Sequence, residues 1–545
     1  KKSTWKKHHK WFGLIFAFFI ILFGASGIVL NHRQFFSDYQ ISRKWLPDAY
    51  RYKSWNNGLL RGTLSCPPGI CQEDSAVLLF GNAGIFLTDH DATTFDDFNR
   101  GFPHGVDWRN IRGIAITPQG DLFAAAQFGL YRYSQKAGWQ AVRLPLQKGE
   151  KLSDITTHGD TLIVIGRSCL YYATSPYRHF NPIILQAPEE YNGKVSLFRT
   201  IWLLHSGELF GTAGKLVMDT LAVILIILSV SGIFYWFLPK YIRRMKQTGR
   251  SATTSIALLK TSLSWHNKIG RTTIVLTLFI ALTGWCLRPP VLLALVYGRI
   301  PAIPFTQLES PNAWNDKLRM LRYDEQQNDW LLATSEGFYS LKSFQSTPVK
   351  ISRTPPVSVM GINVLKQNKQ GNWLTGSFSG MYVWNRHLGN ITDFFTGKTA
   401  PETAGPPFGN HAITGYSSDF DGKLCIAEYE KGSDFASMPA NMETLPMSLW
   451  NFAQEIHTGR IYTVLGKGTL VFIFFCRTGS VMEPDYGIYH QTKKIIEKKS
   501  GIFFFPFIGK RKYRLCHTIC TSVEYFPGIS LHYRGLYSTK ASIAS

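Results

Sequence analysis

A histidine stands at the head of an apolar segment twice in this chain, in HKWFG at residues 9–13 and in HNKIG at residues 266–270. Each segment has a second glycine fourteen residues after the first, in ASG at residues 25–27 and in LTG at residues 282–284. About 20 apolar residues suffice to span a bilayer as a helix. The pattern therefore predicts two membrane-spanning helices that are copies of each other, each with a histidine near one end.

A second histidine motif also occurs twice, as HSGELF at residues 205–210 and as HTGRIY at residues 457–462. Each copy precedes another apolar segment. A histidine that enters a bilayer is energetically costly unless it has a partner or a function. Four histidines placed by an internal repeat therefore favour a metal or haem site.

Apolar segments and the regions between them divide the 545 residues into eight parts. The expected parts are residues 1–31 (cytoplasmic start and first span), 32–205 (outer region), 206–238 (second span), 239–268 (basic loop), 269–297 (third span), 298–457 (outer region), 458–480 (fourth span) and 481–545 (tail). The sequence thus predicts a membrane α-helical protein of four spans with a large outer domain.

Basic residues orient these spans. Residues 1–10 contain five lysines, residues 239–268 contain seven lysines and arginines, and neither stretch has an acidic residue. Positive charge marks the cytoplasmic side, so we expect residues 32–205 and 298–457 on the periplasmic side of a bacterial inner membrane. Because much of the net charge of +23 flanks apolar segments, it indicates membrane lipid and not nucleic acid as the partner.

Both outer regions carry a repeat with β character. Its best copies are DLF…GLY at residues 121–131, DWL…GFY at residues 329–339 and NWL…GMY at residues 372–382. Successive copies lie roughly 40 residues apart, which is typical of β-propeller blades. Neither region has enough copies to close a ring, so we expect one all-β, propeller-like domain built by both. Two separate β-rich domains are the alternative.

The end of the chain departs from the repeat. The fourth span is expected to continue like the second, but Arg477 interrupts it and Glu483-Pro484-Asp485 follows. Residues 481–545 show no clear period. We interpret them as an aberrant or disordered tail, such as a frameshift or read-through would produce, behind a disrupted fourth span.

Two of the eight cysteines, Cys66 and Cys71, enclose a Pro-Pro-Gly turn. A local disulfide is expected if this loop lies in an oxidising compartment. Two unpaired thiols are the alternative.

The HxxxG segments and the H-[ST]-G-x-[LI]-[FY] segments together resemble the PepSY-associated transmembrane family. That family includes bacterial inner-membrane ferric-siderophore reductases and iron-regulated membrane proteins. The resemblance covers the four spans and implies b-type haem held by histidines, with electron transfer across the membrane. The outer regions depart from the family, because they show propeller-like repeats and no small α/β PepSY domain.

Haem iron takes two axial ligands, and imidazole is a common one. We predict His9 and His266 as the inner pair, because each stands at a cytoplasmic helix start four residues before a glycine. We predict His205 and His457 as the outer pair, because each stands at an outer helix start two residues before a glycine. The expected cofactor is one or two haem b groups.

Two further histidines compete for these roles. His32, at the outer end of the first span, could replace either outer ligand, and His8 is adjacent to His9. The alternative for every one of these histidines is an ordinary interfacial side chain, since duplication can also copy a structural residue. Cations near the same helix ends are expected to neutralise haem propionates: Arg33, Arg271, Arg460, Lys215 and Lys268.

The sequence contains no nucleophile elbow, phosphate-binding loop, zinc-protease motif or dinucleotide fingerprint. Electrons are therefore expected from a separate, unidentified donor. The favoured function is haem-mediated reduction of a ferric chelate, such as a siderophore, or of another periplasmic acceptor during iron uptake. The alternative is a haem-free, membrane-anchored propeller that binds or senses a ligand.

Overall fold

The computed structural model describes residues 2–463, except 67–68, 72–75, 148, 359, 403–408 and 421–422. Most of the predicted fourth span, from residue 464 onward, and the whole tail 481–545 therefore lie outside the described residues.

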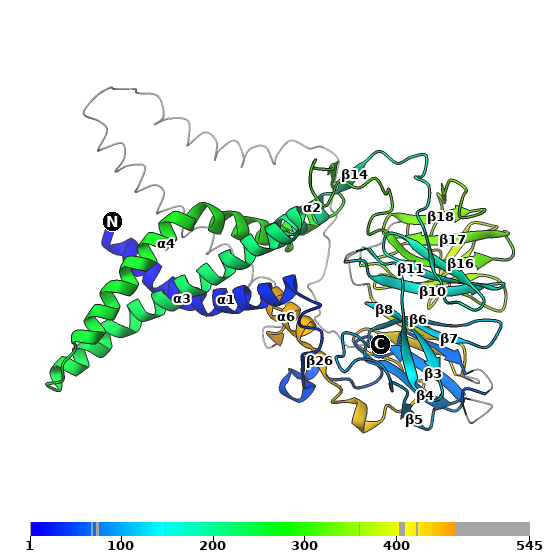
Figure 1. The fold of residues 1–545 in the computed structure, drawn as a ribbon, viewed down its shortest axis with the longest axis horizontal. Helices are drawn as coiled ribbons and strands as arrows, with labels where there is room; N and C mark the ends of the chain where they lie inside the picture. Colours follow the sequence, from blue (N-terminus) through cyan, green and yellow to red (C-terminus); the bar gives the residue numbers. More distant parts are fainter. Residues whose placement is uncertain are drawn as a thin grey trace, which may run out of the picture. The chain divides into compact units, whose positions relative to one another are not determined.

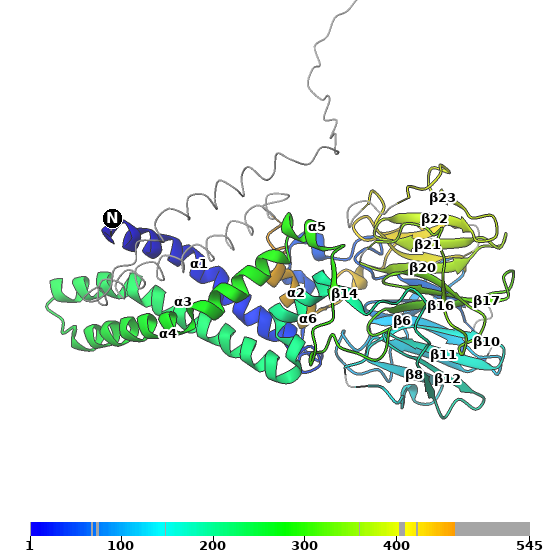
Figure 2. The same cartoon turned by 90° about the horizontal axis from the view of Figure 1, so that it is seen from above.

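The described residues include three long helices: α1 (Lys2–Asn31), α3 (Gly211–Gln247) and α4 (Thr253–Cys286). Helix α3 packs against both α1 and α4 (Figures 1 and 2). Within the described residues, three segments are long and apolar enough to cross a membrane, Trp11–Asn31, Glu208–Gln247 and Thr253–Cys286.

The helix boundaries correct two predictions. The region 239–268, expected as a basic loop, is mostly helical, and only residues 248–252 connect α3 to α4. The third helix ends at Cys286 instead of residue 297, because Pro289 and Pro290 follow and proline cannot continue a helix. A hydropathy window detects the apolar part of a helix and misses its polar extensions, such as the basic last turn of α3. Basic residues in that turn are favourable because they lie at the negative end of the helix dipole.

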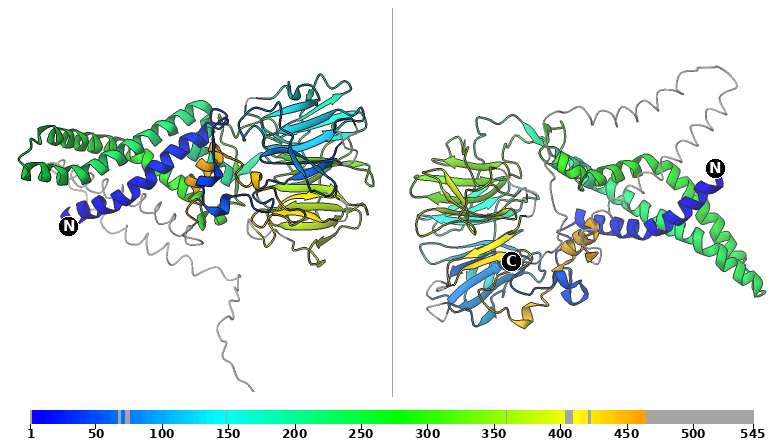
Figure 3. Two further views of the ribbon diagram at one scale, coloured as in Figure 1. Left: turned by 90° about the horizontal axis from the view of Figure 1, so that it is seen from below. Right: turned by 180° about the vertical axis from the view of Figure 1, so that it is seen from behind.

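Two short helices, α2 (Leu197–Ser206) and α6 (Leu449–Thr458), contact the long ones. Helix α6 lies beside α1, and α2 contacts α4 (Figure 3). Two-stranded ladders accompany them: β1 (Gln40–Ile41) pairs with β26 (Met447–Ser448), and β14 (Lys194–Ser196) pairs with β15 (Arg299–Pro301). The unit of a long helix, a ladder and a short helix therefore occurs twice, which is the structural form of the sequence duplication. A short helix α5 (Val291–Leu295) follows α4.

Within the described residues, five larger sheets make up the β region, and their strands pair antiparallel except for β2 with β24. Four of them have four strands each: β6 (Ile111–Ile116), β7 (Leu122–Ala126), β8 (Gly129–Ser134) and β9 (Gly138–Val142); β10 (Leu152–His158), β11 (Thr161–Gly166), β12 (Leu170–Thr174) and β13 (Asn181–Ile183); β16 (Leu318–Asp324), β17 (Asp329–Thr334), β18 (Gly337–Leu341) and β19 (Val349–Lys350); β20 (Ile362–Gln367), β21 (Trp373–Ser377), β22 (Gly380–Asn385) and β23 (Asn390–Asp393). The fifth sheet has the order β25-β24-β2-β3-β4-β5. Its strands are β2 (Gly62–Ser65), β3 (Ala76–Gly81), β4 (Gly84–Asp89), β5 (Phe95–Asp97), β24 (Ile413–Ser417) and β25 (Cys425–Glu428).

The sequence repeat falls on the same hairpin of each sheet. Its copies at residues 121–131, 329–339 and 372–382 become β7–β8, β17–β18 and β21–β22. One repeated hairpin therefore explains the order that the copies share: an acidic or amide residue, then two strands joined by a tight glycine turn.

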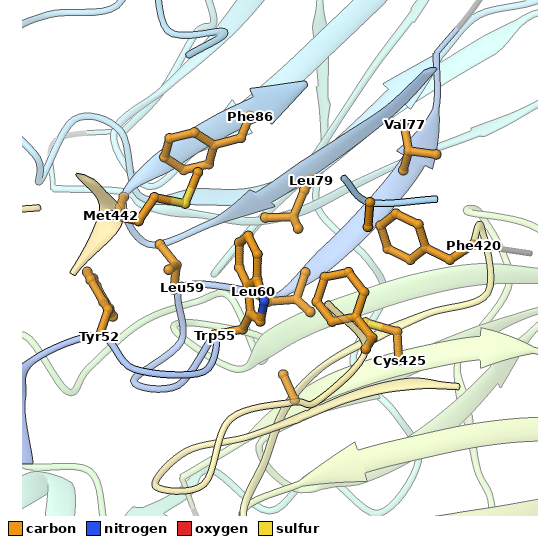
Figure 4. Close-up of a cluster of buried hydrophobic side chains, with 14 residues drawn as sticks. Tyr52, Trp55, Leu59, Leu60, Val77, Leu79, Phe86, Phe420, Cys425 and Met442 are labelled. Atoms are coloured by element: carbon orange, nitrogen blue, oxygen red, sulfur yellow. The ribbon is translucent and has the colours of Figure 1, made fainter. Parts of the chain in front are cut away.

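The fifth sheet joins the two ends of the β region, because β24 pairs in parallel with β2. A buried apolar cluster supports this junction (Figure 4). In it, Trp55 and Leu79 from the first outer region pack with Phe420 and Met442 from the second. The two regions therefore form one domain, and the alternative of two separate β domains is wrong.

The sheets lie one beside another (Figure 2). Neighbouring sheets share buried clusters in a continuous succession. These clusters join β3 to β7, β7 to β11, β11 to β16, β17 to β20, and β20 to β24. Because β24 pairs with β2, the succession returns to the sheet where it began. In the same region Cys66 and Cys71 form the expected disulfide, so the alternative of two free thiols is wrong.

Candidate functional site: two histidine pairs

The outer histidines lie at the ends of the two short helices. His205 is in the last turn of α2, and His457 is in the last turn of α6. The prediction that they begin membrane-spanning helices is therefore wrong. For His205 the reason is clear: a break at Gly207 and a short 3-10 turn (Glu208–Phe210) separate it from α3.

The two short helices have matching caps. Ser196 and Ser448 accept hydrogen bonds from the backbone three residues on, at Arg199 and Asn451, which fixes each helix start. Gly207 and Gly459 end the helices with the left-handed φ of 77° that glycine adopts readily. A Cβ on Gly207 would also lie 2.2 Å from the Gly214 oxygen, so this position has no room for a side chain.

The outer histidines meet across the two halves of the chain. The ring centroids of His205 and His457 are 6.0 Å apart. His205 Nδ1 lies 3.0 Å from the Thr283 hydroxyl of α4, and His457 Nδ1 lies 3.1 Å from the Ser26 hydroxyl of α1. These hydroxyls occupy equivalent places in ASG and LTG, so the duplication gives both rings a hydroxyl partner. His457 Nδ1 also lies 3.0 Å from the Phe23 carbonyl of α1.

The inner histidines also meet. The ring centroids of His9 in α1 and His266 in α4 are 6.2 Å apart. Neither residue begins its helix, since α1 starts at Lys2 and α4 starts at Thr253, which corrects their predicted position at helix starts. His266 Nδ1 lies 2.9 Å from the hydroxyl of Ser231 in α3. His8, the competitor of His9, stacks on Phe12 of the same helix.

Glycines lie against the histidine rings. A Cβ on Gly27 would be 3.4 Å from His457 Cε1, and one on Gly232 would be 3.7 Å from His266 Cε1. A Cβ on Gly13 would meet nothing within 4 Å. Gly27 and Gly232 thus leave space beside the rings of His457 and His266, as a flat macrocycle between helices would require.

Both pairs fit haem iron. A metal–imidazole nitrogen bond is roughly 2 Å long, so two rings that bind one iron from opposite sides have centroids about 6 Å apart once the ring radii are included. Nδ1 of three of the four histidines faces a hydroxyl, which would leave Nε2 as the ligand atom and would orient the ring. Within the described residues, no three His, Cys, Asp or Glu side chains gather as a bare metal ion would need. Two histidines per site is the number that haem takes.

His32 lies elsewhere. Its Nε2 is 2.6 Å from Asp219 Oδ2 on α3, and Asn31 donates to the other oxygen of the same carboxylate at 2.9 Å. The structure therefore gives His32 an acidic partner and does not bring it into either histidine pair.

The cations predicted for the propionates already have partners. Arg33 forms a two-point ion pair with buried Asp107, and its guanidinium stacks on Trp450. Arg460 forms an ion pair with Glu455. The remaining three have these neighbours: Arg271 donates to the Asn267 carbonyl, Lys215 pairs with Glu208 at 3.1 Å, and Lys268 lies over the Trp265 ring.

A cavity of about 1520 Å³ adjoins the outer pair. Its lining includes His205, His457 and Gly27, together with residues of the β region. Ordinary small-molecule pockets have roughly 300–1,000 Å³, so this cavity has room for more than one bound group.

Ser26, Thr283 and Ser231 were not identified from the sequence. Ser26 and Thr283 were visible as the hydroxyl residue before the second glycine in each copy of the repeat. The glycine two residues after His205 and His457 was a helix-end signal, and it would have placed both histidines in a last turn.

The long apolar helices, the β domain and the two histidine pairs together define a class: membrane proteins that are built by internal duplication. The family model of the PepSY-associated TM region matches residues 6–482, and the chain belongs to this family. No match was found among curated proteins.

Two solved structures from B. thetaiotaomicron are similar to the chain, and each is described as the extracellular domain of a hybrid two component system. The first is 10% identical with a TM-score of 0.34, and the match covers 71% of this chain and 34% of that one. The second is 11% identical with a TM-score of 0.32, covering 71% of this chain and 36% of that one. The chain thus spans about a third of the length of each.

Proposed function

We propose that this protein is a haem-b electron-transfer protein of the bacterial inner membrane that reduces ferric chelates on the periplasmic side during iron acquisition. The observation that carries the proposal is the pair of ring separations, 6.2 Å for His9–His266 and 6.0 Å for His205–His457. Each pair joins the two halves of the chain.

The spacing of the pairs supports passage across the membrane. Ser26 holds His457, and Thr283 holds His205. The number of residues from His9 to Ser26 equals the number from His266 to Thr283. At 1.5 Å per residue this is roughly 25 Å of helix, close to the hydrocarbon thickness of about 30 Å. One pair therefore lies near each face of the bilayer if α1 and α4 span it.

Haem b bound at both pairs would supply one-electron redox centres. The chain's own residues then have distinct tasks. The four histidines would hold the haem iron, Ser26, Thr283 and Ser231 would orient their rings, and the glycines would keep room between the helices. When the Fe(III) of a chelate receives an electron, the resulting Fe(II) has a lower affinity for the hard oxygen ligands of the chelator. The iron can then be released.

The proposal includes a fold and a topology. The cyclic succession of sheets supports a closed β-propeller on the periplasmic side. A fourth span after α6 would complete the duplicated set of helices. The basic residues at the end of α3 support a cytoplasmic location for the α3–α4 connection.

The function can be tested by measuring ferric reduction outside proteoliposomes that contain the protein and enclose a reductant. The full chain should reduce external ferric citrate, with Fe(II) trapped by a coloured chelator outside the vesicle. His266→Ala should abolish this reduction, and His179→Ala, an exposed loop substitution, should not. Equal rates with and without His266 in haem-loaded vesicles would contradict the proposal.

A further inference from the structure

The cavity beside the outer histidine pair also reaches part of the β region. Five strands of this region, β6, β10, β16, β20 and β24, begin with the same irregularity, a register shift at their second residue. A β-bulge redirects the side chain of the extra residue. Four of the five bulge residues line the cavity: Arg112, Ser153, Arg319 and Asn363.

Positive charge collects at this part of the cavity. Arg112 comes from β6, Lys151 directly precedes β10, and Arg319 comes from β16. All three are partly buried. Within the described residues, none of the three forms an ion pair, although Asp316 lies close enough to influence Lys151 and Arg319.

Four of the six acidic residues that line the cavity have a basic partner, and Glu150 and Glu402 are the other two. The carboxylates and their partners are Asp316 with Arg167, Glu336 with Arg299 and Lys317, Glu208 with Lys215, and Asp219 with His32. The lining holds eleven lysines and arginines against six aspartates and glutamates, so positive charge is in excess.

Arg112 shows the imbalance most directly. Its guanidinium donates to Gln127 at 2.6 Å, but its buried Nε–H has no acceptor among the described residues. Burial and the nearby arginines lower the pKa of Arg112 well below its usual value. Burial likewise lowers the pKa of Lys151, and it lowers that of Arg319 to about 10. A buried, unpaired donor and crowded cations are unfavourable unless an anion joins them.

We propose that Arg112, Lys151 and Arg319 form a binding site for a small polyanion with carboxylate or phosphate groups. The three side chains come from successive sheets and line the same cavity as His205 and His457. Anion binding at this site does not depend on haem. Its assignment as the site for an anionic ferric chelate, placed next to the outer histidine pair, rests on the proposed function.

Citrate is the probe. We would titrate it into the purified full chain in nanodiscs of zwitterionic lipid and measure heat of binding. Arg319→Gln and Lys151→Gln should each raise the Kd about tenfold, since a hydrogen bond to a charged group contributes that much in a partly buried site. Matched exposed substitutions on the same domain, Arg143→Gln and Lys136→Gln, should leave the Kd unchanged.

Arg319→Lys guards against a folding defect, because it keeps the charge and should retain binding within a few fold. No citrate binding, or equal losses in the exposed controls, would overturn the proposal. Haem propionates are the other source of carboxylates for this site. If citrate binds only after His205→Ala removes the outer haem, the site belongs to the propionates and the proposal of a separate anion site fails. Citrate binding that persists in protein without ferric reductase activity would retain the site and reject the proposed function.

Discussion

The imidazole rings of His205 and His457 lie with centroids 6.0 Å apart, although they come from opposite halves of the chain. Each ring is held by a hydroxyl on a long helix, Thr283 for His205 and Ser26 for His457. Four segments, α1, α2, α4 and α6, therefore build the outer pair. The site can form only when both copies of the duplicated unit fold together.

His205→Ala should remove the outer haem signal and leave the inner one, since His9 and His266 lie 17 residues along α1 and α4 from Ser26 and Thr283, which hold the outer pair. Low-temperature reduced-minus-oxidised spectra and redox titration separate two such components. His457→Ala should remove the same component, and His179→Ala should remove neither. Loss of different components by the two outer variants would show that they do not share one iron.

Ser26→Ala and Thr283→Val should weaken outer haem binding roughly 10- to 100-fold, the usual effect of removing a residue that orients a metal ligand. Haem titration into apo-protein measures this change. Thr272→Val is the matched control, because within the described residues its hydroxyl bonds only the Lys268 carbonyl on the same helix. Unchanged affinity in Ser26→Ala and Thr283→Val would mean that these hydroxyls do not orient the ligands.

Ser231→Ala should have the corresponding effect on the inner site alone. Its hydroxyl lies 2.9 Å from His266 Nδ1. The redox midpoint and occupancy of the inner component should change, while the outer component stays as in the wild type. A shift confined to the outer component would contradict the assignment of the inner pair.

Arg386→Met should destabilise the β domain by about 3–5 kcal/mol, because removal of one partner leaves buried charges uncompensated. Arg386 bonds Asp324 and Asp329, and the Trp373 indole donates to Asp324 at 2.9 Å. Denaturant unfolding measures the loss. Arg143→Met, on the surface, should change the free energy of unfolding by less than roughly 0.5 kcal/mol. A small effect for Arg386→Met would mean that the buried network is dispensable.

Asp329 should contribute to the acid sensitivity of the same domain. Burial alone would raise the pKa of Asp329, but hydrogen bonds from Arg386 and Ser340 outweigh burial and lower it. A lowered folded-state pKa gives stability that is present above the unfolded value of about 3.9 and is lost as the pH falls through the folded value. Asp329→Asn should therefore show a shallower fall of Tm below about pH 4 than the wild type. Parallel curves would contradict this role.

The duplication indicated which histidines lie near each other, because it copies contacts as well as residues; their role as haem ligands stays a prediction. Matching motifs around His9 and His266, and around His205 and His457, indicated which residues meet. The hairpin repeats likewise predicted a single β domain, since each copy has strand residues bounded by a turn glycine.

Other features could not be predicted in this way. Hydropathy does not distinguish a spanning helix from a short helix that ends beside one, so α2 and α6 were missed. The partners of Arg33 and His32, which are Asp107 and Asp219, depend on tertiary packing. The cations of the proposed anion site come from three different sheets, and no local pattern links them.

The most direct test of the central claim is a dithionite-reduced minus oxidised spectrum of the purified full chain, with pyridine haemochrome quantification. Two haem b groups per chain in the wild type, falling to one in both His205→Ala and His266→Ala, is the expected result. Well-folded protein that shows no Soret band when haem is supplied would contradict the account and would favour a haem-free binding domain anchored in the membrane.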